Sequence, residues 1–259
     1  MVSEKFEVSG YFSGEVDISN VIQRLKLYVS ILQNIVHGIS VEKFNVEEID
    51  RSKWEVWKNR LKTKRASRRV VVRPPWEEYL SLNDEIVIEI NPSMAFGTGH
   101  HETTRLCIKG IEYLLKRISD KTVIDVGCGS GILSIVAALL GAKEIVALDI
   151  DQVAVKEAKN NFERNLVKKN IKLVCGYIDS VKGNFDLIVA NISVEAIILM
   201  KNELKNRLSP DGVLLVSGIP FSRRDELISG MEDALFIKKD EFREGDWIAI
   251  FFHVDKNLH

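Results

Sequence analysis

The feature that most constrains the fold is the stretch "TVIDVGCGSGIL" at residues 122–133, an apolar run that ends in alternating glycines and passes into a helical pattern. From there on, short apolar runs alternate with helical ones. The run "EIVALDI" (144–150) precedes "DQVAVKEAKNNFERN" (151–165), where Asp151 is suited to cap a helix. Strands that alternate with helices predict a parallel sheet covered by helices on both faces, with right-handed connections. We therefore expect an α/β fold.

The alternation continues until the last segment of the chain. The sequence predicts strands at 171–176, 185–192 and 212–219, and helices at about 194–208 and 221–235. The final segment, "LFIKKDEFREGDWIAIFFHV", instead contains two strand-like runs joined by the short turn "REGD", which is typical of a β-hairpin. A hairpin there would make the closing strand antiparallel to the rest of the sheet.

Upstream of residue 120 the pattern changes. The runs "EKFEVSGYF", 18–36 and "VEKFNVEEI" predict a strand, helix and strand in a unit of about fifty residues, too small for a large core. Residues 58–73 then carry eight Lys or Arg, and "RPPW" ends any helix. We expect a small α/β domain at 1–52, a basic joint at 53–80 and the main domain at 81–259. The basic residues of the joint form either a solvated surface or a local contact with RNA.

Composition excludes several classes of protein. The chain is 46% hydrophobic and 28% charged, with a net charge of -1, so nothing attracts it as a whole to DNA or to a membrane. The first residues lack the apolar core of a signal peptide, which favours a cytoplasmic protein. Three cysteines show no CxxC spacing and suit small buried side chains, so we expect neither disulfides nor zinc: Cys107, Cys128 and Cys175.

The glycine-rich loop favours a ligand at the carboxyl ends of the strands. Glycine tolerates positive φ and lets a ligand approach the backbone, and it stands at Gly127, Gly129 and Gly131. A dinucleotide fingerprint would need glycine where Ile132 stands, which argues against a nicotinamide oxidoreductase. Asp149, at the end of the second strand, can accept hydrogen bonds from both hydroxyls of a ribose, with Asp151 as the alternative. Asp125 is expected to hydrogen-bond the backbone of the loop.

The stretch "NPSMAFGTGHHETT" (91–104) contains the adjacent residues His100 and His101. Consecutive loop histidines would diverge, and no neighbouring residues complete a ligand set, so we expect no metal site. The stretch also lacks the lysine and the spacing of a phosphate-binding GxxxxGK[ST] loop.

The glycine loop, the strand-end acid and the terminal hairpin together resemble the class I S-adenosylmethionine-dependent methyltransferases. Within that class, residues 95–104 resemble the "AFGTGxHxTT" pattern of the family that methylates the eleventh large-subunit ribosomal protein. The resemblance covers about residues 54–252 and continues in "WKNRL", "IDVGCGSGIL", "LDIDQVAV", "VANI", "SGI" and "GDWIAI". It implies a Rossmann-like seven-stranded sheet with an antiparallel last strand, preceded by a small α/β domain that recognises the substrate.

The resemblance also implies the site residues. Those around S-adenosylmethionine would be Phe96, Gly97 and Thr104 in a loop over the cofactor, Gly127, Gly129 and Gly131 at its methionine part, and Asp149 at its ribose. Asn191 would lie at the methyl-transfer site, touching the cofactor and orienting the amine that is methylated. Phe96 could face the cationic sulfur, a contact worth about 0.5–2 kcal/mol, or be a plain core aromatic.

The residues after Asn191 bear on the substrate. Methyltransferases of adenine or glutamine carry a double-proline turn there, whereas this chain has Ile192 and Ser193. A lysine or N-terminal amine of the ribosomal protein is the better fit. Another protein or a small amine remains an alternative substrate, and a catalytically silent cofactor-binding subunit remains an alternative role. The proton of the amine would leave through water or, as a second choice, through His100 or His101.

Overall fold

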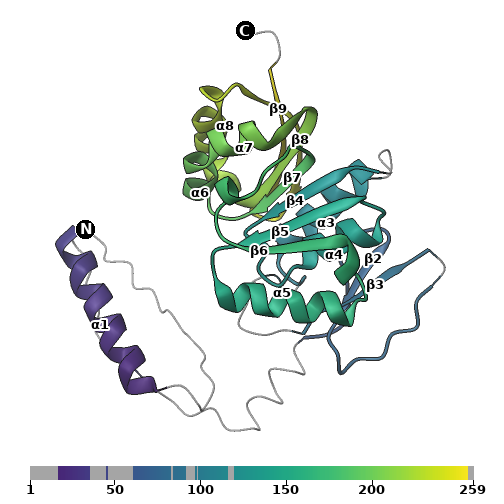
Figure 1. Ribbon diagram of the computed structural model, residues 1–259, viewed down its shortest axis with the longest axis horizontal. Helices are drawn as coiled ribbons and strands as arrows, with labels where there is room; N and C mark the ends of the chain where they lie inside the picture. Colours follow the sequence, from purple (N-terminus) through teal and green to yellow (C-terminus); the bar gives the residue numbers. More distant parts are fainter. Residues whose placement is uncertain are drawn as a thin grey trace. The chain divides into compact units, whose positions relative to one another are not determined.

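The computed structural model describes residues 17–35, 45, 61–82, 84–91, 97, 99–115 and 120–255, and it divides the chain into two compact units, Met1–Arg60 and Leu61–His259. In the smaller unit, helix α1 (Ile18–Ile35) confirms the helix expected at 18–36 (Figure 1). The two flanking runs expected as strands fall, apart from Asn45, outside the described residues.

The larger unit is built on a seven-stranded sheet of order β6-β5-β4-β7-β8-β10-β9 (Figure 1). Its strands are β4 (Thr122–Val126), β5 (Glu144–Asp149), β6 (Ile171–Cys175), β7 (Phe185–Asn191), β8 (Leu208–Pro220), β9 (Phe236–Glu244) and β10 (Trp247–Val254). Neighbouring strands from β6 to β8 pair in parallel, whereas β10 is antiparallel to both β8 and β9. This arrangement confirms the parallel sheet and its antiparallel closing strand.

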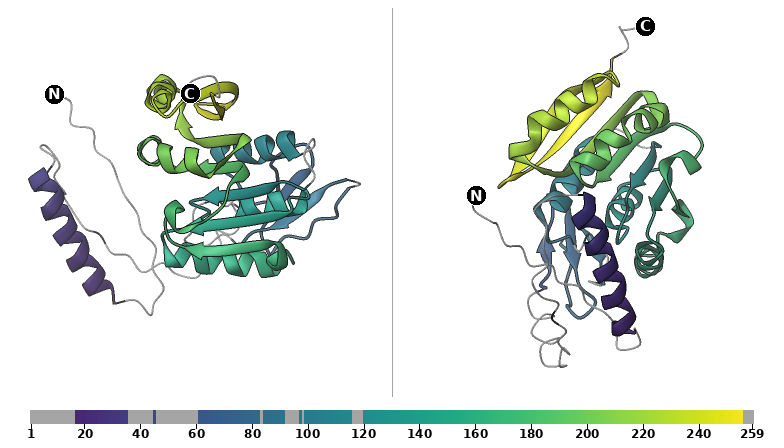
Figure 2. Two further views of the ribbon diagram at one scale, coloured as in Figure 1. Left: turned by 45° about the horizontal axis from the view of Figure 1, so that its top comes forward. Right: turned by 90° about the vertical axis from the view of Figure 1, so that its left-hand side faces the viewer.

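Helices cover both faces of this sheet, as expected (Figures 1 and 2). One face packs on α3 (Glu102–Leu115), α4 (Ile132–Leu139) and α5 (Gln152–Arg164), and the other on α6 (Val194–Leu199), α7 (Lys201–Arg207) and α8 (Arg224–Glu232). Side chains alternate between the two cores along each strand, so that Val123 faces the first core and Ile124 the second.

Some boundaries differ from those expected. The single helix expected at 194–208 is divided into α6 and α7 at Met200, whose φ of -94° and ψ of 8° end one helix and start the next. Strand β8 begins at Leu208, earlier than expected. The helix expected near 221–235 is the shorter α8. Short 3₁₀ helices complete the unit: η1 (Lys168–Asn170), η2 (Ile178–Ser180) and η3 (Phe221–Arg223).

A second, three-stranded sheet precedes the large one in the chain. It consists of β1 (Lys64–Arg65), β2 (Val70–Arg73) and β3 (Ile86–Glu89), in the order β1-β2-β3. Val70, Val72 and Ile88 are buried in the same core as α3 and α4. Residues 61–80, which the sequence placed in a joint, are therefore packed into the larger unit, because the valine run supplies a buried strand between basic residues.

The cysteines follow the sequence only in part. Cys107 and Cys128 are buried, and burial raises the pKa of both thiols. Cys175, at the end of β6, is exposed, so the expectation that it is buried was wrong. Across the described part of the chain, no helix has both the length and the apolar character needed to cross a membrane.

Candidate active site

The glycine loop lies between β4 and α4, at the carboxyl edge of the sheet. Gly127, Gly129 and Gly131 have φ values of 70°, 53° and 78°, in the left-handed region that favours glycine. The N–H groups of Gly127 and Cys128 both donate to the Leu148 carbonyl at 2.9 Å, which ties the loop to β5. A Cβ on Gly127 would stand 2.7 Å from Cγ2 of Ile192. The loop is thus closely packed where Gly127 meets Ile192.

Asp149 joins this loop to the end of β5. One carboxylate oxygen accepts the Gly129 N–H at 2.9 Å, and the other accepts the Asp151 N–H at 3.0 Å. Each oxygen of a carboxylate can accept more than one hydrogen bond, so the half-buried carboxylate retains acceptor capacity for a ligand. Asp151 instead accepts the Val153 N–H at 2.8 Å and caps α5, which confirms the cap expected from the sequence.

Gly97 is brought to the glycine loop from more than thirty residues upstream. Its carbonyl accepts a hydrogen bond of 2.6 Å from the Ser130 hydroxyl, and its φ is 102°. Gly99, with a φ of 81°, packs against Val72 and Ile132, where a Cβ would meet both side chains at about 3 Å. Phe96 lies outside the described residues. Gly97 and Gly99 therefore lie beside the glycine loop and the helix that follows it.

Asn191 ends β7 next to the glycine loop. Its amide nitrogen lies 3.5 Å from the Thr104 hydroxyl, in the first turn of α3, where Thr104 is fully buried. Its amide oxygen is buried and has no hydrogen-bond partner within the described structure. A buried carbonyl without a partner is costly, so it points to a donor supplied by a ligand.

The end of β8 supports Asn191 from the other side. Asn191 pairs with Ser217, and the backbone of Gly218, with a φ of 88°, lies so close to the Ile192 carbonyl that any Cβ would overlap it. Ser193 then caps α6 by accepting the Ala196 N–H. The turn after Asn191 is consequently fixed by its neighbours.

The two histidines have separate partners. The His100 Nε2 lies 2.8 Å from the Lys62 carbonyl oxygen, whereas the His101 Nδ1 lies 2.8 Å from the Thr103 hydroxyl and accepts the Thr103 N–H at 3.3 Å. The His101 ring also meets Trp247 edge-on, with 4.9 Å between ring centroids. Among the residues that the structure describes, no group of three metal-ligating side chains is found.

Asp125 supports the glycine loop from beneath. One of its oxygens accepts both the N–H and the hydroxyl of Ser134, at 3.0 and 2.7 Å, so the expected backbone bond is present but reaches the first turn of α4 instead of the loop. Complete burial raises the pKa of Asp125 to about 6, although the bonds from Ser134 oppose the rise. The residue thus stabilises the start of α4.

Several site residues were not identified from the sequence. Asn161 is buried on α5, where its amide donates to the Ser130 carbonyl at 2.9 Å. A polar residue on the apolar face that contains Ala158 and Phe162 was the signal for it. Ile150 and Tyr177, which follow β5 and β6 at the same edge of the sheet, are 62% and 65% exposed.

A doubly covered seven-stranded sheet with an antiparallel closing strand, and a glycine loop bonded to a strand-end carboxylate, define a class I methyltransferase fold. A model of the family described as "Ribosomal protein L11 methyltransferase (PrmA)" matches residues 1–255. The chain therefore belongs to the ribosomal protein L11 methyltransferase family.

Individual relatives agree with the family model. The ribosomal protein L11 methyltransferase of Clostridium botulinum (strain Alaska E43 / Type E3) is 40% identical over 248 residues, which span 94% of this chain and 77% of that one. That of Thermoanaerobacter pseudethanolicus is 40% identical over 249 residues, 94% and 79% of the two chains. The crystal structure of a ribosomal protein L11 methylase from Lactobacillus delbrueckii subsp. bulgaricus superposes with a TM-score of 0.70 at 34% identity, over 74% of this chain and 98% of that one.

Proposed function

We propose that this protein transfers methyl groups from S-adenosylmethionine to lysine or N-terminal amines of ribosomal protein L11. Membership of the family supports the reaction and its substrate. The observation that carries the proposal within the structure is the Asn191 amide oxygen, which is buried at a strand end beside the glycine loop and has no partner among the described residues. An acceptor in that position suits a substrate that brings N–H groups.

The residues at the carboxyl edge fit the cofactor. When bound, S-adenosylmethionine supplies a methyl group on a cationic sulfur. The backbone of Gly127, Gly129 and Gly131 would lie against its methionine part. Asp149 would accept hydrogen bonds from the ribose, as its remaining acceptor capacity allows. Gly97 and Thr104 would line the cofactor from the opposite side, with Phe96 as the aromatic neighbour of the sulfur.

Asn191 would orient the amine. A lysine with a pKa of about 10.4 needs about 4.6 kcal/mol to lose its proton at pH 7, and burial of the amine lowers that pKa. If the Asn191 oxygen accepts one N–H, the nitrogen lone pair is turned toward the methyl group. Displacement at a sulfonium needs little covalent help, so such positioning supplies most of the catalysis.

The proton of the amine would leave through water. His101 uses its Nδ1 to cap Thr103, and the His100 Nε2 is held at the Lys62 carbonyl, so each ring has a structural partner at one nitrogen. These contacts favour water over either histidine.

A separate proposal is that residues 58–73 contact RNA. In the described part of this stretch, Lys62 pairs with Glu77, Arg65 with Glu85 and Arg73 with Glu89. Within the described part, Lys64, Arg68 and Arg69 form no ion pair with a described residue, so an RNA contact there would rest first on these three.

The test is methyl transfer to an undermethylated ribosomal extract. We would add methyl-labelled S-adenosylmethionine and the purified protein, and identify the labelled polypeptide by mass spectrometry. Label on lysine or the N-terminal amine of ribosomal protein L11 supports the proposal. Label on another protein or on a small amine overturns the substrate. Absence of label despite measured cofactor binding indicates a silent cofactor-binding subunit.

A further inference from the structure

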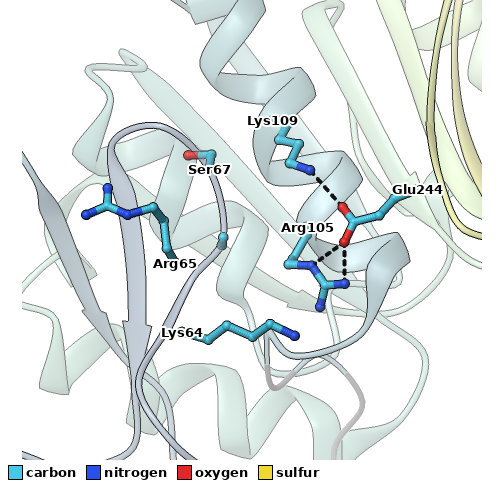
Figure 3. Close-up of a pocket in the computed structure, with 7 residues that line it drawn as sticks. Lys64, Arg65, Ser67, Arg105, Lys109 and Glu244 are labelled. Carbon is cyan, nitrogen blue, oxygen red and sulfur yellow. Dashed lines mark hydrogen bonds and ion pairs between the residues drawn. The ribbon is translucent and has the colours of Figure 1, made fainter.

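The end of the β9–β10 hairpin meets the start of α3. Glu244, the last residue of β9, accepts a hydrogen bond of 2.8 Å from Nε of Arg105 and a second bond from its Nη2. Lys109, one turn along α3, donates to the other oxygen of Glu244 at 2.7 Å (Figure 3). All three side chains line a surface hollow of about 380 Å³, but the Arg105 side chain is only 7% exposed. Arg105 is therefore a nearly buried cation that depends on Glu244.

Arg105 also holds the backbone that precedes α3. Its Nη1 donates to the His100 carbonyl, and its Nη2 lies 3.0 Å from Glu102. A planar guanidinium with fixed donors can hold several acceptors in one geometry, which a lysine cannot do. Although burial alone would raise the pKa of Glu244, its bonds from Arg105 and Lys109 lower it overall, so the carboxylate remains charged at neutral pH.

This cluster is adjacent in the chain to the proposed site. Thr104, next to Arg105, contacts the Asn191 amide, and Gly97 and Gly99 lie against the glycine loop and its helix. The hairpin touches the same segment a second time, where Trp247 of β10 meets the His101 ring. Two contacts thus join the hairpin to residues 99–105.

The hairpin end also reaches the segment after β8. The guanidinium of Arg243 lies 3.7 Å from the centre of the Phe221 ring, and the Phe221 N–H donates to the Asp246 carbonyl at 2.7 Å. The hairpin therefore contacts residues 99–105 on one side. On the other it contacts the segment that follows β8, the strand that pairs with β7 beside Asn191.

We propose that Arg105 and Glu244 form a positioning pair that holds residues 99–104 in the geometry needed to bind the cofactor and to place Thr104 beside Asn191. The inference rests on the proposed function, since that segment is assigned to the cofactor. The pair touches neither reacting atom. It acts through the His100 carbonyl and the first turn of α3.

The experiment compares Glu244→Gln, Glu244→Asp and the double variant Arg105→Met/Glu244→Gln with a matched control, Lys109→Met. The control removes the 43%-exposed donor from the same carboxylate without touching residues 99–104. We would measure the affinity for S-adenosylhomocysteine by calorimetry, the steady-state kcat and KM values, and the melting temperature of each variant. Amide exchange of residues 99–104 without cofactor gives a further reading.

If Arg105 and Glu244 form a positioning pair, cofactor affinity and melting temperature should not change in parallel across the variants. Glu244→Gln should weaken cofactor binding about 10-fold, which corresponds to about 1.4 kcal/mol, and Glu244→Asp should recover part of it. Replacing both members of a buried ion pair often restores stability, so the double variant should melt within about 3 °C of the wild type. Its affinity for the cofactor should nevertheless stay below that of the wild type. The amide protons of residues 99–104 should also exchange faster, because the His100 carbonyl has lost its donor. Lys109→Met should bind normally.

Two results would overturn the inference. One is a double variant that binds cofactor as tightly as the wild type. The other is a loss of affinity that follows the melting temperature through all variants, Lys109→Met included, since that is what a merely structural pair gives. Binding is measured without the protein substrate. If wild-type protein binds cofactor but leaves ribosomal protein L11 unlabelled, the proposed substrate is wrong, and the positioning pair is still tested by cofactor binding. If the wild type binds no cofactor, both proposals are wrong.

Discussion

The two sides of the candidate site differ in how completely their polar groups are bonded. On the proposed cofactor side, Asp149, Ser130 and Asn161 take part in hydrogen bonds of 2.6 to 2.9 Å within the glycine loop and to Gly97. On the transfer side, Asn191 has one contact of 3.5 Å and a buried oxygen without a described partner. One side is formed in the absence of a ligand, and on the other we expect a ligand to supply the missing donor.

This difference has an energetic meaning. A preformed binding surface lowers the cost of ordering when a ligand binds, which favours affinity. An unpartnered acceptor is unfavourable until a donor meets it, so its interaction is gained on the way to the transition state. We therefore expect changes on the cofactor side to affect stability and affinity, and changes at Asn191 to affect turnover.

The largest effect is expected for Asn191→Ala. Loss of one positioned polar group in an active site typically costs about 10²- to 10³-fold in kcat. Cofactor affinity, measured by calorimetry, should fall only a few-fold, because the glycine loop and Asp149 are intact. Asn184→Ala, at the opposite end of the same strand region, is the matched control and should retain turnover. Equal losses of affinity and turnover in Asn191→Ala would remove the distinction between the two sides.

The next effect tests how rigid the cofactor side is. In Gly131→Ala the new Cβ would overlap the Phe162 ring, and the residue would be held at a φ of 78°. Strain and overpacking together should cost about 2 to 4 kcal/mol of unfolding free energy in urea titrations.

Gly183→Ala separates these two causes. Gly183 has a φ of 99°, but nothing lies within 4 Å of its Cβ position, so only backbone strain is introduced. It should cost about 1 kcal/mol. If both variants lost the same stability, close packing of the glycine loop against α5 would not be the reason for Gly131.

How far the sequence predicted this site depended on the distance between partners in the chain. The glycine loop, Asp149 and the terminal hairpin were predictable, because each is written in a short stretch with its own spacing. The bond from Ser130 to Gly97 and the pair of Arg105 with Glu244 join residues 33 and 139 positions apart, which no local pattern reveals. The strands β1 and β2 were missed because basic residues flank a valine run that is buried only by the rest of the fold.

A pH-dependent effect comes from Asp125. Burial raises its pKa from 3.8 in the unfolded chain to about 6, so its contribution is full below pH 3.8 and is lost as the pH rises through about 6. Between pH 5 and 7.5 the unfolding free energy should fall by about 1.4 kcal/mol from this group alone. Asp125→Asn should remove that part of the decline. Parallel stability curves for wild type and variant across this range would mean that the carboxyl does not titrate there.

The smallest effect is expected for Ser130→Ala, which removes the hydroxyl that donates to the Gly97 carbonyl. A hydrogen bond of this kind contributes about 1 kcal/mol, so cofactor affinity should fall about 5-fold if residues near Gly97 cover the cofactor. Ser67→Ala removes a hydroxyl that accepts the Val70 N–H at 3.1 Å, away from the glycine loop, and should lower stability without changing affinity. If Ser130→Ala lost stability but kept its affinity, the bond would hold the fold together without forming the cofactor side. The preformed surface would then consist of the glycine loop and Asp149 alone.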